Sequence, residues 1–244
     1  MARVRLFVDH PLGEGQPVPL SREAAHYLFG VMRLGQGAEL SVFNGADGEW
    51  DARVAEAGKK GGTLEPLAQS VPQWLPPDLW LMFAPVKKAR TDFIVEKAVE
   101  MGVRRLLPVA TDFTNSERIR QDRLQAHARE AAEQCGAVFV PEVAELSKLS
   151  AVLADWPDAR RLMFCDEAAA GSSSALAGVF AEAEGPGPWA VLIGPEGGFS
   201  EAERTRLYGL PQAHVATLGP RILRAETAAV AALTLWQTRF GDWA

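Results

Sequence analysis

The sequence has few of the residues that build metal centres and disulfide frameworks. Its 244 residues include two cysteines and four histidines. Cys135 and Cys165 do not have CxxC spacing, and no histidine lies near either of them at a metal-ligand spacing. We therefore expect no metal and no disulfide scaffold, and interpret both cysteines as reduced thiols of the core.

Long apolar runs are also absent. No run approaches the roughly 18 residues that a membrane span needs, and residues 1–11 lack the apolar region of a secretory signal. The sequence therefore predicts a cytoplasmic protein with no membrane partner. Apolar residues make up 48% of the chain and charged residues 23%, which is typical of a globular core of normal size.

The chain as a whole lacks the positive charge that is common in nucleic-acid-binding proteins. Its formal net charge is −6. The charges are unevenly distributed, however: residues 85–130 carry 10 basic and 7 acidic groups, a net +3, and residues 131–185 carry 3 and 9, a net −6. This distribution allows a local positive face on an acidic protein, although composition alone does not indicate RNA.

The first 70 residues have the pattern of a small β-rich domain. Alternating apolar positions predict strands at 3–8, 38–43, 50–57 and 63–68, and one helix is expected at 21–32 with Ser21 as its N-cap. Several short strands and one helix suggest a small barrel. Three prolines between Pro72 and Pro77 break any regular element. We therefore predict two domains, 1–72 and 73–244.

After this boundary, strand-like apolar runs alternate with helical stretches. This alternation predicts a parallel α/β sheet. The expected strands are 79–84, 106–110, 161–165, 189–194 and 214–218, and the expected helices are 91–101, 116–135, 174–183, 201–208 and 225–239.

The first candidate site is the loop Ile193–Ser200, which reads IGPEGGFS. It follows an apolar strand and precedes a helix that Ser200 is expected to cap, which is where open α/β sheets bind ligands. The loop does not match GxGxxG, and it is not a P-loop because no lysine follows it. Acidic residues in the loop and in the helix after it would repel a phosphate, so a nucleoside without phosphates suits it better. A tight strand-to-helix turn is the alternative interpretation.

Two further stretches carry unusual charge. Leu218–Ala228 reads LGPRILRAETA and also leads from a strand into a helix; the alternative is a surface turn with a local salt bridge. Pro85–Arg90 is a basic loop before the helix that Gly102 is expected to end. Such a loop is either a solvated face or a phosphate-binding segment.

These three stretches, in this order, resemble the SPOUT-class 16S ribosomal RNA (uracil-N3) methyltransferase family. The matching residues are Glu96-Lys97-Ala98 with Met101-Gly102-Val103, then Gly194–Ser200 with Glu203, then Leu218-Gly219, Arg221–Arg224 and Glu226-Thr227-Ala228. Arg5–Val8, His26, Leu28, Val31-Met32-Arg33 and Lys59-Lys60 match as well, so the resemblance spans essentially the whole chain. Ala137 departs from the family, which usually has an arginine there.

The resemblance implies the fold, the cofactor and the partners. We expect a PUA-like β-barrel over 1–72 that binds RNA, and over 73–244 an α/β domain with a trefoil knot that binds S-adenosylmethionine. The expected partners are 16S ribosomal RNA within the 30S subunit and a second copy of the chain. The final helix is compatible with a homodimer, since Ala225, Ala228, Ala229, Ala231 and Ala232 allow close approach; a helix buried within its own domain is the alternative.

The resemblance and the chemistry together give the candidate residues. For catalysis we expect Arg224, Glu226 and Arg5, because negative charge develops on uracil as N3 loses its proton. For cofactor binding we expect Gly194, Pro195, Glu196, Gly197, Gly198, Leu218, Gly219, Arg221, Ile222 and Leu223. For RNA binding we expect Arg3, Arg33, Lys59, Lys60, Lys87, Lys88 and Arg90.

Three alternative functions stay open from the sequence. A ribose 2′-O-methyltransferase of the same knotted class would give a different RNA product. A ribosome-assembly factor that only binds RNA would not bind S-adenosylmethionine. A Rossmann oxidoreductase is disfavoured, since no GxGxxG follows a strand.

Overall fold

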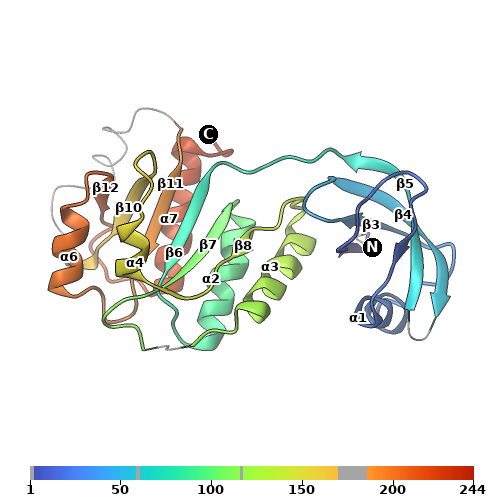
Figure 1. Ribbon diagram of the computed structural model, residues 1–244, viewed down its shortest axis with the longest axis horizontal. Helices are drawn as coiled ribbons and strands as arrows, with labels where there is room; N and C mark the ends of the chain where they lie inside the picture. Colours follow the sequence, from blue (N-terminus) through green and yellow to red (C-terminus); the bar gives the residue numbers. More distant parts are fainter. Residues whose placement is uncertain (1–2, 59–60, 116–117, 170–185) are drawn as a thin grey trace. The chain divides into compact units, whose positions relative to one another are not determined.

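The computed structural model describes residues 3–58, 61–115, 118–169 and 186–244, and its chain divides into two compact units. The small unit contains residues 1–75 together with 132–140, and the large unit contains 76–131 and 141–244. Each unit has a β-sheet of its own (Figure 1).

The sheet of the small unit is mixed and has five strands in the order β1-β3-β4-β5-β2. Their bounds are Arg5–Phe7 (β1), Val18–Pro19 (β2), Glu39–Phe43 (β3), Glu49–Gly58 (β4) and Gly61–Val71 (β5). The long pair β4–β5 contains three register shifts, which bend and twist an antiparallel ribbon and so favour a curved sheet. Alternate positions such as Leu40, Val42 and Val54 are buried in one core, as the alternating sequence pattern predicts.

The predicted helix of the small unit is present in two forms. Ser21 accepts a hydrogen bond from the backbone N–H of Ala24 and so caps α1 (Arg22–Ala25). The next six residues, His26–Val31, continue as a π-helix. The chain leaves this helix through Arg33, whose φ of 57° lies in the left-handed region that non-glycine residues rarely adopt.

The large unit has a parallel sheet in the order β12-β10-β11-β6-β7-β8, and β9 also pairs with β7. The strands are Leu79–Phe83 (β6), Arg105–Ala110 (β7), Glu142–Val143 (β8), Ser147–Lys148 (β9), Arg161–Cys165 (β10), Trp189–Ile193 (β11) and Ala213–Ala216 (β12). All pairs in this sheet are parallel, as the alternation of strands and helices predicts. Central strands such as β11 are buried along their full length.

Helices cover both faces of this sheet. They are Lys88–Glu100 (α2), Gln121–Cys135 (α3), Leu149–Ala154 (α4), Glu201–Tyr208 (α6) and Ala225–Phe240 (α7). Leu149 and Leu153 of α4 and Leu207 of α6 pack in one cluster with Met82 and Phe164. On the other face α2 packs with α7, and α7 with β11 (Figure 1).

Several boundaries differ from the sequence prediction. The helix expected at 116–135 begins at Gln121, and the short elements β8, β9 and α4 were not predicted, because two-residue strands and a six-residue helix carry little periodicity. The helix expected at 174–183 lies outside the described residues. No described helix is both long and apolar enough to span a membrane.

Candidate active site

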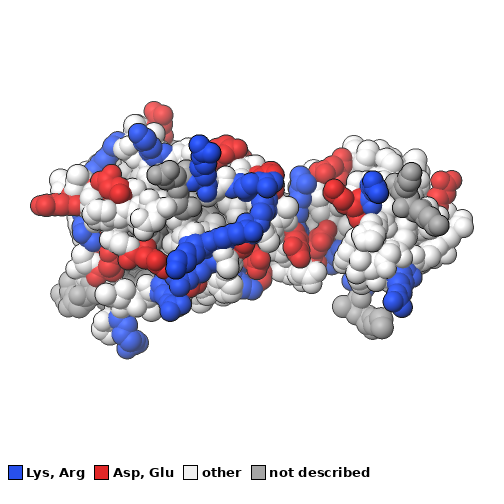
Figure 2. Space-filling view, turned by 90° about the horizontal axis from the view of Figure 1, so that it is seen from below, with Lys and Arg blue, Asp and Glu red and all other residues white. Residues whose placement is uncertain are grey.

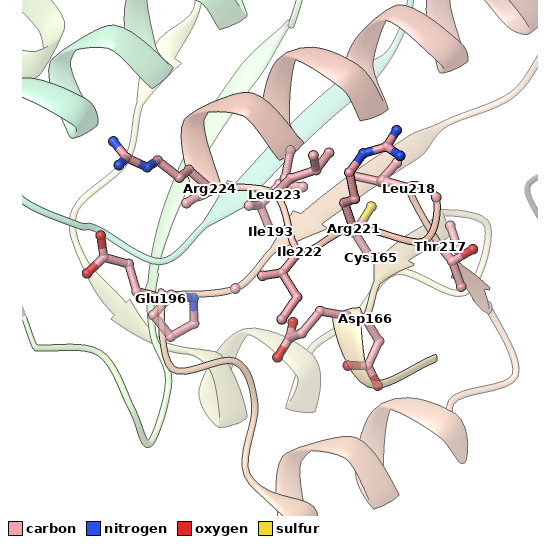
Figure 3. A pocket seen from close by; sticks show the side chains of 17 residues that line it. Cys165, Asp166, Ile193, Glu196, Thr217, Leu218, Arg221, Ile222, Leu223 and Arg224 are labelled. Atoms are coloured by element: carbon pink, nitrogen blue, oxygen red, sulfur yellow. The ribbon is translucent and has the colours of Figure 1, made fainter. Parts of the chain in front are cut away.

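A cavity of about 210 Å³ lies where three neighbouring strands of the large sheet end (Figure 3). Cys165 is the last residue of β10, Ile193 of β11 and Ala216 of β12, and Thr217 follows β12. All four residues line the cavity. The remaining lining comes from the segments that follow these strands and from Ala225 and Ala228 in the first turns of α7. Their backbone curves over the strand ends, which is where parallel sheets bind ligands.

Most of the expected cofactor-binding residues line this cavity. They are Gly194, Pro195, Glu196, Leu218, Gly219, Arg221, Ile222 and Leu223, and Arg224 lines it as well. Gly197 and Gly198 are not among its lining residues. A Cβ on Gly197 would lie 3.3 Å from the Cβ of Phe113, so this glycine faces Phe113.

Two glycines of the IGPEGGFS loop are required by close contacts. A Cβ on Gly194 would lie 2.6 Å from the ring of Phe199, which is buried against Phe164 at 5.0 Å between ring centroids. Gly198 has a φ of 69°, and its Cβ would lie 1.8 Å from Oε1 of Glu167. The loop therefore folds over Phe199 and leaves room for Glu167, which lines the cavity.

The turn into α6 has the capping geometry that the sequence predicts. The Ser200 hydroxyl accepts from the backbone N–H of Glu203, and the Glu203 carboxylate accepts from the backbone N–H of Ser200. This reciprocal capping box fixes where the glycine loop ends. Glu203 also accepts a hydrogen bond from the backbone N–H of Asp112, after β7.

An acidic wall, made of Asp166 and Glu167, was not predicted from the sequence. The Asp166 side chain is fully buried and accepts hydrogen bonds from Arg204 Nε at 3.2 Å and from the Tyr208 hydroxyl at 2.9 Å. Partial burial, together with this hydrogen bond to Asp166, raises the pKa of Tyr208. Both wall residues follow β10, where no glycine-rich motif marks a ligand loop.

Cys165 also lines the cavity, and burial raises the pKa of its thiol to about 12. The thiol is therefore protonated at neutral pH, and only the thiolate is a strong nucleophile. Cys165 fits the expected role of a core residue, whereas Cys135 is exposed, so the expectation that both cysteines lie in the core is wrong for Cys135.

The two arginines of the second loop are exposed. Neither Arg221 nor Arg224 forms an ion pair with a described residue. Figure 3 shows Arg224 on the same side of the cavity as Glu196, and Arg221 on the other side. Their guanidinium groups are therefore available to an anionic ligand.

A second, cationic groove of about 250 Å³ adjoins the cavity. Lys87, Lys88 and Asn115 line it, together with Pro195 and Glu196, which also line the cavity. Lys87 is the N-cap residue of α2. Figure 2 shows Lys and Arg side chains in a band on one face of the large unit, with Asp and Glu side chains beside it.

Arg90 lies in the first turn of α2 and contacts two carboxylates. Its Nη1 donates to Oε1 of Glu196, and its Nε lies 3.5 Å from Oε1 of Glu226. Glu226 therefore pairs with Arg90, and no ion pair with Arg224 is present. Three residues from separate candidate stretches of the sequence meet here.

The remaining candidates lie in the small unit. Arg5 is 15% exposed; its Nε donates to Glu49 at 2.7 Å, and its other nitrogens donate to the backbone carbonyls of Ala132, Glu133 and Ala137. Its guanidinium is thus occupied within the small unit. Arg3 pairs with Asp51 and Glu39, Arg33 is exposed, and Lys59 and Lys60 lie outside the described residues.

Comparisons with known proteins agree with this geometry. The family model of the RNA methyltransferase domain matches residues 74–237, two thirds of the chain, and that of the RNA methyltransferase PUA domain matches residues 20–67. The chain belongs to the RNA methyltransferase family. The predicted resemblance and the PUA-like and α/β fold class are confirmed.

Individual relatives of this methyltransferase family match nearly the full chain. Ribosomal RNA small subunit methyltransferase E of Buchnera aphidicola is 28% identical over 98% of this chain and 97% of its own length, and that of Bacillus subtilis is 25% identical over 94% of both. Among solved structures, the Neisseria gonorrhoeae enzyme of the same name, bound to S-adenosylmethionine, superposes with a TM-score of 0.88 at 26% identity, covering 99% of this chain and all of that one. A methyltransferase from Legionella pneumophila, also with S-adenosylmethionine bound, has the same TM-score and coverage at 27% identity.

Proposed function

We propose that this chain transfers the methyl group of S-adenosylmethionine to N3 of a uridine in 16S ribosomal RNA. The observation that carries this proposal is the cavity at the ends of β10, β11 and β12, enclosed by both family loops and adjoining the cationic groove. The named relatives act on small-subunit ribosomal RNA, and two solved neighbours have S-adenosylmethionine bound.

The cavity has the chemistry that this cofactor needs. Bound there, S-adenosylmethionine supplies a methyl group on a positively charged sulfur. Ile193, Leu218 and Leu223 offer apolar contacts for a nucleoside, and backbone groups of the two loops are within the lining. The lining carries charges of both signs: Asp166 and Glu167 form the acidic wall, and Arg221 and Arg224 belong to the second loop. S-adenosylmethionine has both a positive sulfonium and a carboxylate, so this lining suits it.

We assign the catalytic work to Arg224 and Glu226. The exposed guanidinium of Arg224 would stabilise negative charge on the uracil oxygens as N3 loses its proton. Glu226 would accept that proton or hold the imide N–H by a hydrogen bond. Arg5, the third expected catalytic residue, has its donors occupied by Glu49 and three carbonyls, so we give it a structural role.

The cationic groove is the proposed place for the RNA backbone. Lys87 and Lys88 form no ion pair with a described residue and lie beside the loop that lines the cavity. Phosphate contacts by such lysines position RNA without reading its sequence. Arg3 and Arg33 remain proposed RNA contacts of the small unit, and the assembled 30S subunit remains the proposed substrate.

The oligomeric state is a further part of the proposal. We propose the homodimer and the trefoil knot that the resemblance implies. Ala231 of α7 is only partly buried within one chain and allows a second helix to approach, whereas Ala225 and Ala232 are buried in their own chain and Ala228 lines the cavity. Light scattering at micromolar concentration tests the dimer, and a fully active monomer contradicts it.

The decisive experiment is a product analysis. The purified chain is incubated with S-adenosylmethionine and with 30S subunits from cells that lack the homologous enzyme, and the 16S nucleosides are identified by mass spectrometry. We expect N3-methyluridine. A 2′-O-methylated nucleoside indicates the ribose methyltransferase, and absence of methylation together with absent cofactor binding in calorimetry indicates an RNA-binding assembly factor.

A further inference from the structure

Arg90 differs from the two lysines beside it in the same basic segment. Lys87 and Lys88 line the cationic groove and have no ion-pair partner among the described residues. Arg90 is 27% exposed in its side chain and contacts carboxylates of two other segments, Glu196 and Glu226. Its charge is therefore directed to protein groups, whereas a phosphate contact needs a cation that is free.

The two carboxylates that Arg90 contacts lie at different parts of the site. Glu196 lines both the cavity and the cationic groove, so it stands at the border between them. Glu226 lies in the first turn of α7, directly after Arg224 and Ala225, which line the cavity. Arg90 thus links α2, the glycine loop and the start of α7 through one guanidinium.

Glu226 has one oxygen without a partner. Oε1 faces Arg90, whereas Oε2 is buried and accepts no hydrogen bond from a described residue. A buried carboxylate oxygen in this state is costly, and in native proteins it commonly reflects a ligand, a water or a catalytic role. The orientation of the carboxylate depends on the contact with Arg90, since no other described cation lies within ion-pair distance of it.

We propose that Arg90 is a positioning residue for methyl transfer. It holds Glu196 at the border of the cofactor cavity and fixes the carboxylate of Glu226 at the start of α7, directly after Arg224 and Ala225. This proposal rests on the proposed function, and it replaces the expectation that Arg90 binds RNA phosphate. A planar guanidinium suits this task because its nitrogens can serve two carboxylates at once in a fixed geometry, which an ammonium group does less well.

The test compares Arg90→Gln and Arg90→Lys with Lys88→Gln as the matched variant. All three are measured in the full-length chain for kcat and KM with 30S subunits, for the salt dependence of RNA binding, and for the Kd of S-adenosylmethionine by calorimetry. Circular dichroism melting checks that each variant is folded.

For Arg90→Gln we expect kcat to fall about a hundredfold, the effect of a misplaced reacting group, while KM for RNA and the salt slope stay as in the unchanged chain. Arg90→Lys should recover part of kcat, because a point charge can pair with one carboxylate. Lys88→Gln should give the opposite result: a raised KM, a kcat that is kept, and a salt slope reduced by about 1. The Kd of the cofactor should rise about fivefold in Arg90→Gln, as expected for loss of an exposed ion pair worth about 1 kcal/mol.

Two results with Arg90→Gln overturn the proposal. If Arg90→Gln raises KM and lowers the salt slope with kcat kept, as in Lys88→Gln, then Arg90 is a phosphate contact. If Arg90→Gln is folded and leaves both kcat and cofactor Kd unchanged, it positions nothing. If the protein without any substitution methylates no RNA, the proposed function is wrong. The Kd of the cofactor can be measured without RNA, and it then decides whether Arg90 holds Glu196.

If Arg90→Gln does not fold, Arg90→Lys decides. A kcat and a cofactor Kd equal to those of the protein without substitutions overturn the proposal, and a partly reduced kcat supports it.

Discussion

The arginines of the small unit and those of the cavity loop have opposite surroundings. Arg5 is bound by a carboxylate and three backbone carbonyls, and Arg3 by two carboxylates. Arg221 and Arg224 are exposed at the cavity and pair with no described residue. An arginine whose guanidinium is held by carboxylates and carbonyls of its own unit stabilises the fold, and one without such partners can bind a ligand.

This comparison separates residues that look alike in the sequence. Arg5 and Arg224 both belong to stretches that resemble the family, and both are candidates for catalysis. Their partners decide between the roles: truncating Arg5 should affect stability, and truncating Arg224 should affect the reaction. The predictions below test this separation, from the largest expected effect to the smallest.

Arg224→Gln should show the largest effect, on the rate. Removing one group that stabilises developing negative charge typically lowers kcat by about 10²–10³-fold. Because Arg224 is exposed and has no ion pair with a described residue, the melting temperature should stay the same. Single-turnover methylation of 30S subunits measures the rate. A variant with normal kcat and a lower melting temperature would reverse the roles assigned to Arg224 and Arg5.

Arg5→Gln should show the next largest effect, on stability. The variant leaves the carboxylate of Glu49 and three carbonyls without their cation in a side chain that is only 15% exposed. Hydrogen bonds to charged groups contribute about 1.5–3 kcal/mol each, so a loss of about 2–3 kcal/mol in unfolding free energy is expected after allowing for relaxation. Urea unfolding measures it.

The matched control is Arg53→Gln, which removes an ion pair with Glu65 whose partners are 48% and 39% exposed. Solvent screens such an exposed pair, so little change in the free energy of unfolding is expected. Equal losses in both variants would show that the partners of Arg5 contribute no more than a surface pair. A normal cofactor Kd in Arg5→Gln is expected as well.

The sequence predicts the elements of the large unit well, because buried parallel strands such as 161–165 and 189–193 are continuous apolar runs. It also locates both cavity loops, since their glycines and arginines are unusual. It does not reveal the acidic wall. Asp166 and Glu167 are ordinary charged residues after a strand, and only the burial of Asp166 and its partners Arg204 and Tyr208 make them a defined wall.

Two further features could not be predicted because they depend on backbone groups or on tertiary neighbours. Residues 132–140 belong to the small unit, and Arg5 holds them through backbone carbonyls, which every residue has. A fragment that starts at residue 73 would leave these carbonyls without Arg5, so domain function is better tested in the full chain. Likewise, Glu226 and Arg90 are 136 positions apart in the sequence, and only the fold brings them together.

Gly198→Ala tests the glycine loop of the large unit. Gly198 has a φ of 69°, which strains an L-residue, and the new Cβ would displace the carboxylate of Glu167. A strained non-glycine residue costs about 1–3 kcal/mol, and we expect about 2 kcal/mol of lost stability together with weaker cofactor binding. Gly197→Ala is the matched control, because its Cβ meets Phe113 at 3.3 Å, away from the cavity lining. If calorimetry finds that Gly198→Ala and Gly197→Ala both bind S-adenosylmethionine with unchanged affinity, Glu167 is excluded from the cofactor site.

Tyr208→Phe should have the smallest effect, and its pH dependence identifies the cause. Tyr208 is half exposed, and its hydroxyl donates to Asp166. Removal of the hydroxyl should lower the free energy of unfolding by about 0.5–1 kcal/mol, the lower part of the range for a hydrogen bond. Partial burial and this hydrogen bond raise the pKa of Tyr208 in the folded chain.

Since the folded state favours the protonated phenol, the contribution of Tyr208 is complete below the unfolded pKa of about 10 and is lost as pH rises through the higher folded pKa. The difference in unfolding free energy between the two chains should therefore be constant from about pH 6 to 9 and shrink above about pH 10. Urea titrations at several pH values measure this difference, in which other titrating groups cancel. A difference that grows above pH 10 would mean that Tyr208 does not donate to Asp166, and that Arg204 alone holds the acidic wall.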